Sequence, residues 1–172
     1  MSTDNERLHE LVAVAAESPV APLAMERALH SILVFRVGAR MFGTPTRYVY
    51  EVVVSGAITQ VPTARPYILG ITLVRGRLVP VISLSELLGT PPSDEAAPTL
   101  PRLLILRDGS LEIAVMSEAT LGLFDVDVTD LGSSAGPRPD CIAAEVEFRQ
   151  RLLVVLDIPA LLASVVDDKG VH

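Results

Sequence analysis

The chain has few of the residue types that build most catalytic and metal sites. Its 172 residues include one cysteine, three histidines and no tryptophan. The single cysteine, Cys141, excludes an internal disulfide and a cysteine-rich metal site, and a lone cysteine is usually a small buried hydrophobe. The histidines are His9, His30 and His172, so none lies where the β-type sequence would place a general base or a zinc ligand. We therefore expect no enzymatic activity, no metal and no cofactor.

Long hydrophobic runs are also missing, although hydrophobic residues make up 49% of the chain and the mean hydropathy is +0.44. The longest apolar stretch, residues 152–166, contains Asp157 and Pro159 and is shorter than the roughly 20 residues that a membrane-spanning helix needs. The first ten residues are polar and acidic, unlike a secretory signal. The sequence thus predicts a cytoplasmic globular protein without direct membrane insertion.

Positive charge is scarce as well, and the formal net charge is −7. This balance argues against nucleic acid as a partner, because nucleic-acid-binding proteins carry a basic surface. The charge is uneven along the chain: residues 1–86 hold 8 basic and 7 acidic side chains, and residues 87–172 hold 6 and 14. Such asymmetry indicates two faces or lobes with different electrostatic preferences for partners.

The first 28 residues have the pattern of a helical extension. Thr3 and Glu6 have capping-box spacing, and apolar residues fall on one helical face between residues 3 and 17. Residues 18–22 contain two prolines and are typical of a linker. We expect residues 1–28 to form an N-terminal helix and linker, with the helix either packed on the body or serving as a docking segment.

From Ser31 onward the sequence consists of short β-type runs separated by turn residues, which is typical of small barrels or a sandwich. Asp108-Gly109 between two apolar runs is a strong hairpin signal. Residues 85–88 are expected to form one helical turn, and the proline-rich residues 90–101 a loop between two halves. The expected strands are residues 32–37, 48–54, 78–84, 103–106, 111–116, 121–128 and 152–158, with a half-buried strand around Val146 and Phe148.

The chain also contains a weak internal repeat. Shifted by 74 positions, residues 66–88 align with residues 140–162 and are identical at seven of 23 positions. Shifted by 71, residues 32–38 align with residues 103–109. Two blocks in the same order with nearly equal offsets predict two related β modules packed together. We place them at about 29–90 and about 101–166, within one domain of residues 29–166.

Two pairs of carboxylates are candidates for other chemistry. Asp125 and Asp127 are two residues apart on an expected strand, as are Glu145 and Glu147, so each pair shares a face. Paired carboxylates can hold a metal or act as an acid and a base. Their apolar alternating neighbours instead favour the solvent-exposed faces of half-buried strands.

The most distinctive segment is residues 68–84. Gly70 and Gly76 interrupt apolar, β-prone sequence, where glycine usually marks a bulge, a sharp turn or a close backbone approach. Arg75 and Arg77 flank the second glycine, and their guanidinium groups are available for carboxylates. The whole ordered string is far more specific than a single arginine-glycine turn.

In its order of motifs the sequence resembles the CheW-like family. The pattern of that family is an apolar strand, then VxEI, then ITxVPxxPxxIxGxxNLRGxxxPVxDL. The chain carries ILVFRVG at 32–38, YVYEVV at 48–53 and ITQVPTARPYILGITLVRGRLVPVISL at 58–84. Later it carries IAVMSEATLGLFDV at 113–126 and LLVVLDIPALL at 152–162, so the resemblance covers about residues 31–163.

The resemblance implies an all-β fold of two small, packed, five-stranded SH3-like β-barrels with short helical turns. It also implies a non-enzymatic adaptor that couples a CheA-type histidine kinase to the cytoplasmic tips of methyl-accepting chemoreceptors. Association with other CheW-like domains in receptor arrays is a further implication. Carried over position by position, the partner-binding surfaces of the family correspond to Val49, Glu51, Gly70, Arg75 and Gly76.

The chain departs from the family pattern at three positions that we expect to tune binding. The Asn before LRG is Leu73, the Asp of PVxDL is Ser83, and the Asp after the strand near 113–116 is Ser117. These departures leave open a modulator that binds the receptor or the array but not the kinase. A small-molecule-binding β-barrel domain, which would need a deep apolar pocket, and a metal enzyme using one of the carboxylate pairs are alternatives from other classes.

Overall fold

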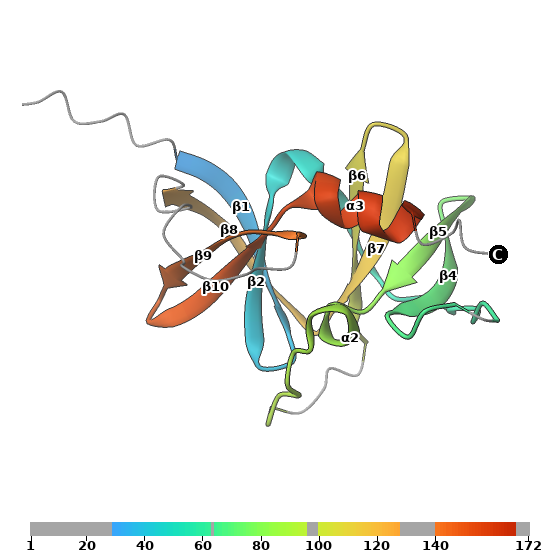
Figure 1. The fold of residues 1–172 in the computed structure, drawn as a ribbon, viewed down its shortest axis with the longest axis horizontal. Coiled ribbons are helices and arrows are strands. Elements are labelled where there is room, and N and C mark those ends of the chain that lie inside the picture. Colours follow the sequence, from blue (N-terminus) through green and yellow to red (C-terminus); the bar gives the residue numbers. More distant parts are fainter. Residues whose placement is uncertain (1–28, 63, 96–99, 128–139, 168–172) are drawn as a thin grey trace, which may run out of the picture.

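The computed structural model describes residues 29–62, 64–95, 100–127 and 140–167, so the expected N-terminal helix and linker lie outside the described residues (Figure 1). The described part forms ten strands and three short helices, and none of these helices is long and apolar enough to cross a membrane. In chain order the elements are β1 (Leu29–Val37), β2 (Arg40–Pro45), the 3-10 helix η1 (Thr46–Tyr48), β3 (Val49–Val54), β4 (Ile68–Val74), β5 (Arg77–Ile82), α2 (Leu84–Leu88), β6 (Arg102–Asp108), β7 (Leu111–Ser117), β8 (Ala119–Asp127), β9 (Ile142–Phe148), β10 (Arg151–Leu156) and α3 (Ile158–Asp167).

The strands form two five-stranded sheets, which confirms the expected mostly-β architecture (Figure 1). Sheet A has the strand order β8-β1-β2-β10-β9, and sheet B has the order β3-β6-β7-β5-β4. Neighbouring strands are antiparallel except at β2–β10 and β5–β7, which are parallel. The hairpin expected at Asp108-Gly109 is present as β6–β7, with Asp108 opposite Leu111.

The contiguous modules expected at about 29–90 and about 101–166 do not coincide with the two sheets. Sheet A takes β1 and β2 from the first half of the chain and β8, β9 and β10 from the second. Sheet B takes β3, β4 and β5 from the first half and β6 and β7 from the second. The apolar pattern of a strand indicates that the strand is buried. It does not indicate which other strand pairs with it, because that pairing depends on packing across the whole chain.

The internal repeat reappears in the registers of the strands. Strands β1 to β5 correspond in order to β6 to β10, and the two sheets then have the same strand order. The irregularity between Val34 and Phe35, opposite β8, lies 71 residues from the one between Ile105 and Leu106, opposite β3. In β4 and β9 the irregular positions also match, with an offset of 74. The repeat is therefore a property of the fold as well as of the sequence.

Three clusters of buried side chains make up the core. The largest lies between the sheets, where residues of β1, β2 and β10 meet residues of β5, β6 and β7 under the apolar face of α3. Each sheet also curls around a smaller cluster of its own. The largest fully buried side chains include Ile32, Phe35, Phe42, Ile82, Leu84, Leu103, Leu104, Ile105, Leu106, Ile113, Leu153 and Leu156. Each contributes about 1.5–3 kcal/mol, so the central cluster is the main force that joins the two sheets.

Gly70 lets sheet B close on itself. The chain after β3 returns to the far edge of the sheet, where Thr59 and Ile71 exchange backbone hydrogen bonds of 2.8 and 2.9 Å. The hydroxyl of Thr72 donates to the Ala57 carbonyl at 2.9 Å and fixes the same contact. A Cβ at Gly70 would lie 2.2 Å from the Thr59 carbonyl oxygen, and the φ of Gly70 is 145°. Only glycine fits this close approach.

Gly70→Ala should therefore destabilise the protein by about 3 kcal/mol or more, because backbone atoms cannot move aside as a flexible side chain can. Gly76→Ala is the matched control, since Gly76 also has a positive φ of 81° but nothing within 4 Å of the added Cβ. It should cost about 1–2 kcal/mol. Urea denaturation of both variants checks the difference, and equal losses of stability would show that the closure does not depend on Gly70.

Cys141 lies in the cluster between the sheets, as expected for a lone hydrophobic cysteine. Burial raises the pKa of its thiol above the ordinary value, so the reactive thiolate is scarcer at neutral pH than in an exposed cysteine. Labelling by Ellman's reagent should be slow in the native protein and fast in urea. Labelling of the native protein at neutral pH as fast as that of an exposed cysteine would contradict this burial.

Candidate partner-binding surface

Glu51 and Arg75 form an ion pair across the edges of sheet B. Glu51 lies on β3, Arg75 lies in the β4–β5 turn, and Nε of Arg75 donates to Oε2 of Glu51 at 2.7 Å. The two residues meet because the curled sheet brings its first and last strands together. The hydrogen bond and the negative charge of Glu51 raise the pKa of Arg75 above its usual range. The side chain of Arg75 remains 74% exposed, so it is both anchored and accessible.

The β4–β5 turn presents Arg75 through a left-handed backbone. Val74 is opposite Arg77, and the two turn residues have φ of 47° (Arg75) and 81° (Gly76). Positive φ at both positions is the geometry of a type I′ hairpin, which matches the twist of the flanking strands. Gly76 is thus required by its backbone conformation rather than by a neighbouring atom.

A wider cluster of charged and aromatic side chains surrounds this pair. Glu112 on β7 lies 3.2 Å from Nη2 of Arg77 and 2.6 Å from Nη2 of Arg107. The guanidinium carbons of Arg77 and Arg107 lie 4.9 and 3.7 Å from the ring centroid of Tyr50. We call these residues the Tyr50 cluster: Tyr50, Glu51, Arg75, Arg77, Arg107 and Glu112. Tyr50 itself is 49% exposed, which makes its ring available to a partner.

Within this cluster, sequence reasoning marked Glu51 and Arg75 as partner-binding residues and Arg77 as a guanidinium available for carboxylates. The pairing of Arg107 with Glu112 was not predicted. The two turn residues of the β6–β7 hairpin are Gly109 and Ser110, which puts Arg107 opposite Glu112, whereas a turn at Asp108-Gly109 would put residue 107 opposite residue 110. The approach of Tyr50 to Arg77 was not predicted either, because it depends on the curvature of sheet B.

The other expected partner-binding residues lie in different surroundings. Val49 begins β3 opposite Leu106 and packs partly against the core between the sheets. Gly70 lies against the Thr59 carbonyl, where sheet B closes. Leu73 is 66% exposed and stands opposite Leu78, which is 69% exposed, so the two form an apolar pair beside the Arg75 turn. Sequence reasoning named Leu73 but missed Leu78.

Ser83 and Ser117 are buried, which separates them from the surface. The hydroxyl of Ser83 accepts a hydrogen bond from the Glu86 N–H and caps α2. Asp157, 74 residues later, accepts from the Ala160 N–H at 3.0 Å and caps the first turn of α3 in the same way. Both helices therefore begin at a short polar side chain, although the residue type differs.

The two carboxylate pairs lie on edge strands of sheet A, Asp125 and Asp127 on β8 and Glu145 and Glu147 on β9. Within the described ranges, no three histidine, cysteine or acidic residues are grouped as a metal site would need. This arrangement gives no support to a metal enzyme built on either pair.

The geometry defines a two-sheet β-protein with a cluster of charged and aromatic side chains on sheet B. A sequence profile of the CheW-like domain matches residues 31–166. The chain therefore belongs to the CheW-like family, as the resemblance of its motifs implied. This is a scaffolding family without enzymatic activity, which confirms the expectation of a non-enzymatic protein.

Individual relatives agree with this assignment. The chain is 22% identical over 145 residues to the chemotaxis protein CheW of Thermotoga maritima, covering 81% of this chain and 92% of that protein. It is 32% identical over 108 residues to the protein FrzA of Myxococcus xanthus, covering 63% and 66%. The crystal structure of the scaffolding protein TtCheW from Thermoanaerobacter tengcongensis superposes with a TM-score of 0.64 at 19% identity, covering 78% of this chain and 88% of that one. The last likeness shows a shared fold.

The cap at Ser83 leads to a prediction that separates a structural role from a binding role. Ser83→Ala should destabilise the protein by about 1 kcal/mol, and Ser83→Asp, which restores the residue of the family pattern, should retain the cap and the stability. Urea denaturation checks both variants. If Ser83→Ala is as stable as the wild type but binds partners more weakly, Ser83 acts in binding and not as a cap.

Proposed function

We propose that this protein is a non-enzymatic cytoplasmic adaptor of a chemosensory system, coupling a CheA-type histidine kinase to the cytoplasmic tips of chemoreceptors. The observation that carries the proposal is the Glu51–Arg75 ion pair, which joins the two segments that the family resemblance marks as partner-binding. The relatives include a chemotaxis protein and a scaffolding protein, which supports the same role.

The surface around the pair has the composition of a protein-binding surface. Tyr50, Arg75 and Arg77 lie together, and tyrosine and arginine are enriched where binding energy is concentrated. Leu73 and Leu78 add exposed apolar area on the adjoining hairpin. Signalling contacts of micromolar affinity, about −8 kcal/mol, need only a surface of this modest kind.

A modulator that binds the receptor but not the kinase is the second candidate, and Leu73 favours it. The family has a polar Asn at this position, whereas here an exposed leucine stands opposite another exposed leucine. A surface that became apolar at the hairpin can lose one partner and keep the other. Separate affinities for a receptor-tip fragment and for the regulatory domain of the kinase distinguish the two candidates.

The depressions on the described surface do not favour a small-molecule-binding domain. They include sites of about 450, 240 and 220 Å³, all bordered by Arg47; the site of 220 Å³ is lined mainly by apolar residues but is smaller than a typical ligand pocket. A ligand-binding barrel would instead bury most of its ligand in an apolar cavity.

Arg75→Glu should weaken binding of a receptor-tip fragment or a kinase regulatory domain by about tenfold or more, because it reverses an accessible charge and repels Glu51. The melting temperature should stay close to that of the wild type, since the side chain is largely exposed. Arg40→Glu on β2 makes the same charge change at another exposed arginine and should leave binding intact. Calorimetric titration of each fragment checks these outcomes.

The double variant Glu51→Arg/Arg75→Glu tests what the pair does. If its role is to hold the β4–β5 turn against β3, the reversed pair should recover much of the lost affinity. If Arg75 itself contacts an acidic partner, the double variant should remain weak. Wild-type affinity in the single variant Arg75→Glu would show that the surface is assigned wrongly.

A further inference from the structure

The two crossings between the sheets carry opposite charges. The chain passes from sheet A to sheet B at η1, after β2, and returns after β7. At the return crossing, Oε1 of Glu118 accepts a hydrogen bond of 3.0 Å from the Gly38 N–H in the β1–β2 turn. Its other oxygen, Oε2, lies 3.5 Å from Nη1 of Arg36. A backbone donor and a guanidinium thus hold one carboxylate at this corner.

The first crossing keeps the donors of this corner but replaces the carboxylate. The offset of 71 places Arg107 at the position of Arg36 and Gly109 at the position of Gly38. The turn glycines have the same backbone conformation, with φ of 56° and 57°, so their N–H groups are oriented alike. The residue equivalent to Glu118 is Arg47 on η1. One half of the protein therefore has the carboxylate of Glu118 at this position, and the other half has the cationic side chain of Arg47.

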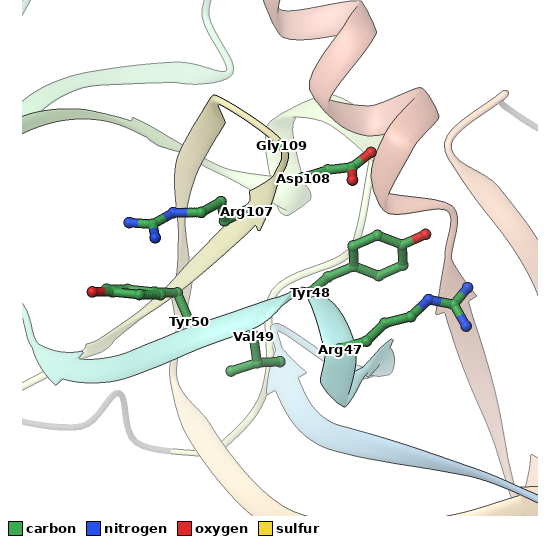
Figure 2. A pocket seen from close by; sticks show the side chains of 7 residues that line it. All are labelled: Arg47, Tyr48, Val49, Tyr50, Arg107, Asp108 and Gly109. Atoms are coloured by element: carbon green, nitrogen blue, oxygen red, sulfur yellow. The ribbon is translucent and has the colours of Figure 1, made fainter.

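A depression of about 450 Å³ marks the place where the internal carboxylate is missing (Figure 2). In Figure 2, Arg107 extends over Tyr50 on one side, Arg47 extends beside Tyr48 on the other, and Asp108 and Gly109 lie on the hairpin between them. The residues that line it are Arg47, Tyr48, Val49, Tyr50, Arg107, Asp108 and Gly109.

The donors in this depression are not equally engaged. Arg107 already pairs with Glu112. Within the described part of the chain, Arg47 has no ion pair and stacks only on Tyr48, with its guanidinium carbon 4.8 Å from the ring centroid. The Gly109 N–H likewise has no acceptor among the described residues. Because Glu112 neutralises Arg107, the donors that remain are the cation of Arg47 and the Gly109 N–H, beside the single lining carboxylate of Asp108. These two donors favour a negatively charged acceptor.

We propose that this depression binds the carboxylate of a glutamate or aspartate side chain on a protein partner, held by Arg47 and the Gly109 N–H in the way that Glu118 is held in the other half. A free small anion would gain little here, because Arg47 is exposed and one ion pair in water contributes almost nothing by itself. On a partner protein the same contact fixes the register of a larger interface. The inference rests on the proposed adaptor role only for the identity of that partner.

An oligoglutamate peptide tests the site without any natural partner. In a nitrogen-15 NMR titration it should shift the Gly109 amide and the Arg47 Nε resonances in a saturable manner at low salt. Arg47→Glu should weaken this binding by about tenfold or more, because the new carboxylate occupies the site from within as Glu118 does. Arg40→Glu makes the same charge change elsewhere and should have no effect, and Asp108→Asn should tighten binding. Arg47→Gln provides a neutral second variant.

Three results would overturn the proposal. One is the absence of a saturable shift at Gly109, and another is an equal loss of affinity in Arg40→Glu and Arg47→Glu. The third is binding of free glutamate as tight as that of the peptide, which would assign the site to a small carboxylate. Fragments of the receptor tip and the kinase then test the adaptor role separately: if the wild type binds neither fragment while the peptide results hold, the proposed function fails and the carboxylate site stands.

Discussion

The core between the two sheets is the interaction on which the rest of the structure depends. Phe35 and Phe42 on the β1–β2 hairpin meet Leu106 and Ile113 on the β6–β7 hairpin, and all four are buried. Because each hairpin occupies the middle of its sheet, this contact places the edge strands on the outside. The remaining strands then curl around the smaller clusters, and their turns and edges become the exposed surface on which partners can be bound.

The crossings of the chain make the two sheets inseparable, yet they allow the surfaces to diverge. Each sheet takes strands from both halves, so neither half of the sequence contains a complete sheet. At equivalent surface positions the halves differ: Leu73 opposite Leu78 in sheet B corresponds to Glu147 opposite Leu152 in sheet A. The core positions keep their apolar character in both halves because packing constrains them, whereas exposed positions are free to acquire different partners.

Local patterns predicted much of the local structure, although the expected strands omitted β2 and β4. The hairpin at Asp108-Gly109, the helical turn near residues 85–88 and the tight turn at Gly76 follow from residues adjacent in sequence, and each is present, with the hairpin turning at Gly109 and Ser110. The assignment of strands to modules followed sequence order and does not match the sheets. Ser83 shows a further limit, since a residue singled out as a departure at the binding surface is a buried helix cap.

Residue order and alternation predicted the mostly-β architecture and the repeat, and the resemblance of the motifs predicted the family and marked Glu51 and Arg75 as separate candidates. The contact between these two residues, the exchange of strands between the halves, the position of Tyr50 beneath Arg107 and the presence of Arg47 where the other half has Glu118 became visible only in the folded chain. The physical reason is that side-chain direction along a strand follows from the sequence, whereas the curvature and pairing of the sheets are set by non-local packing of the core.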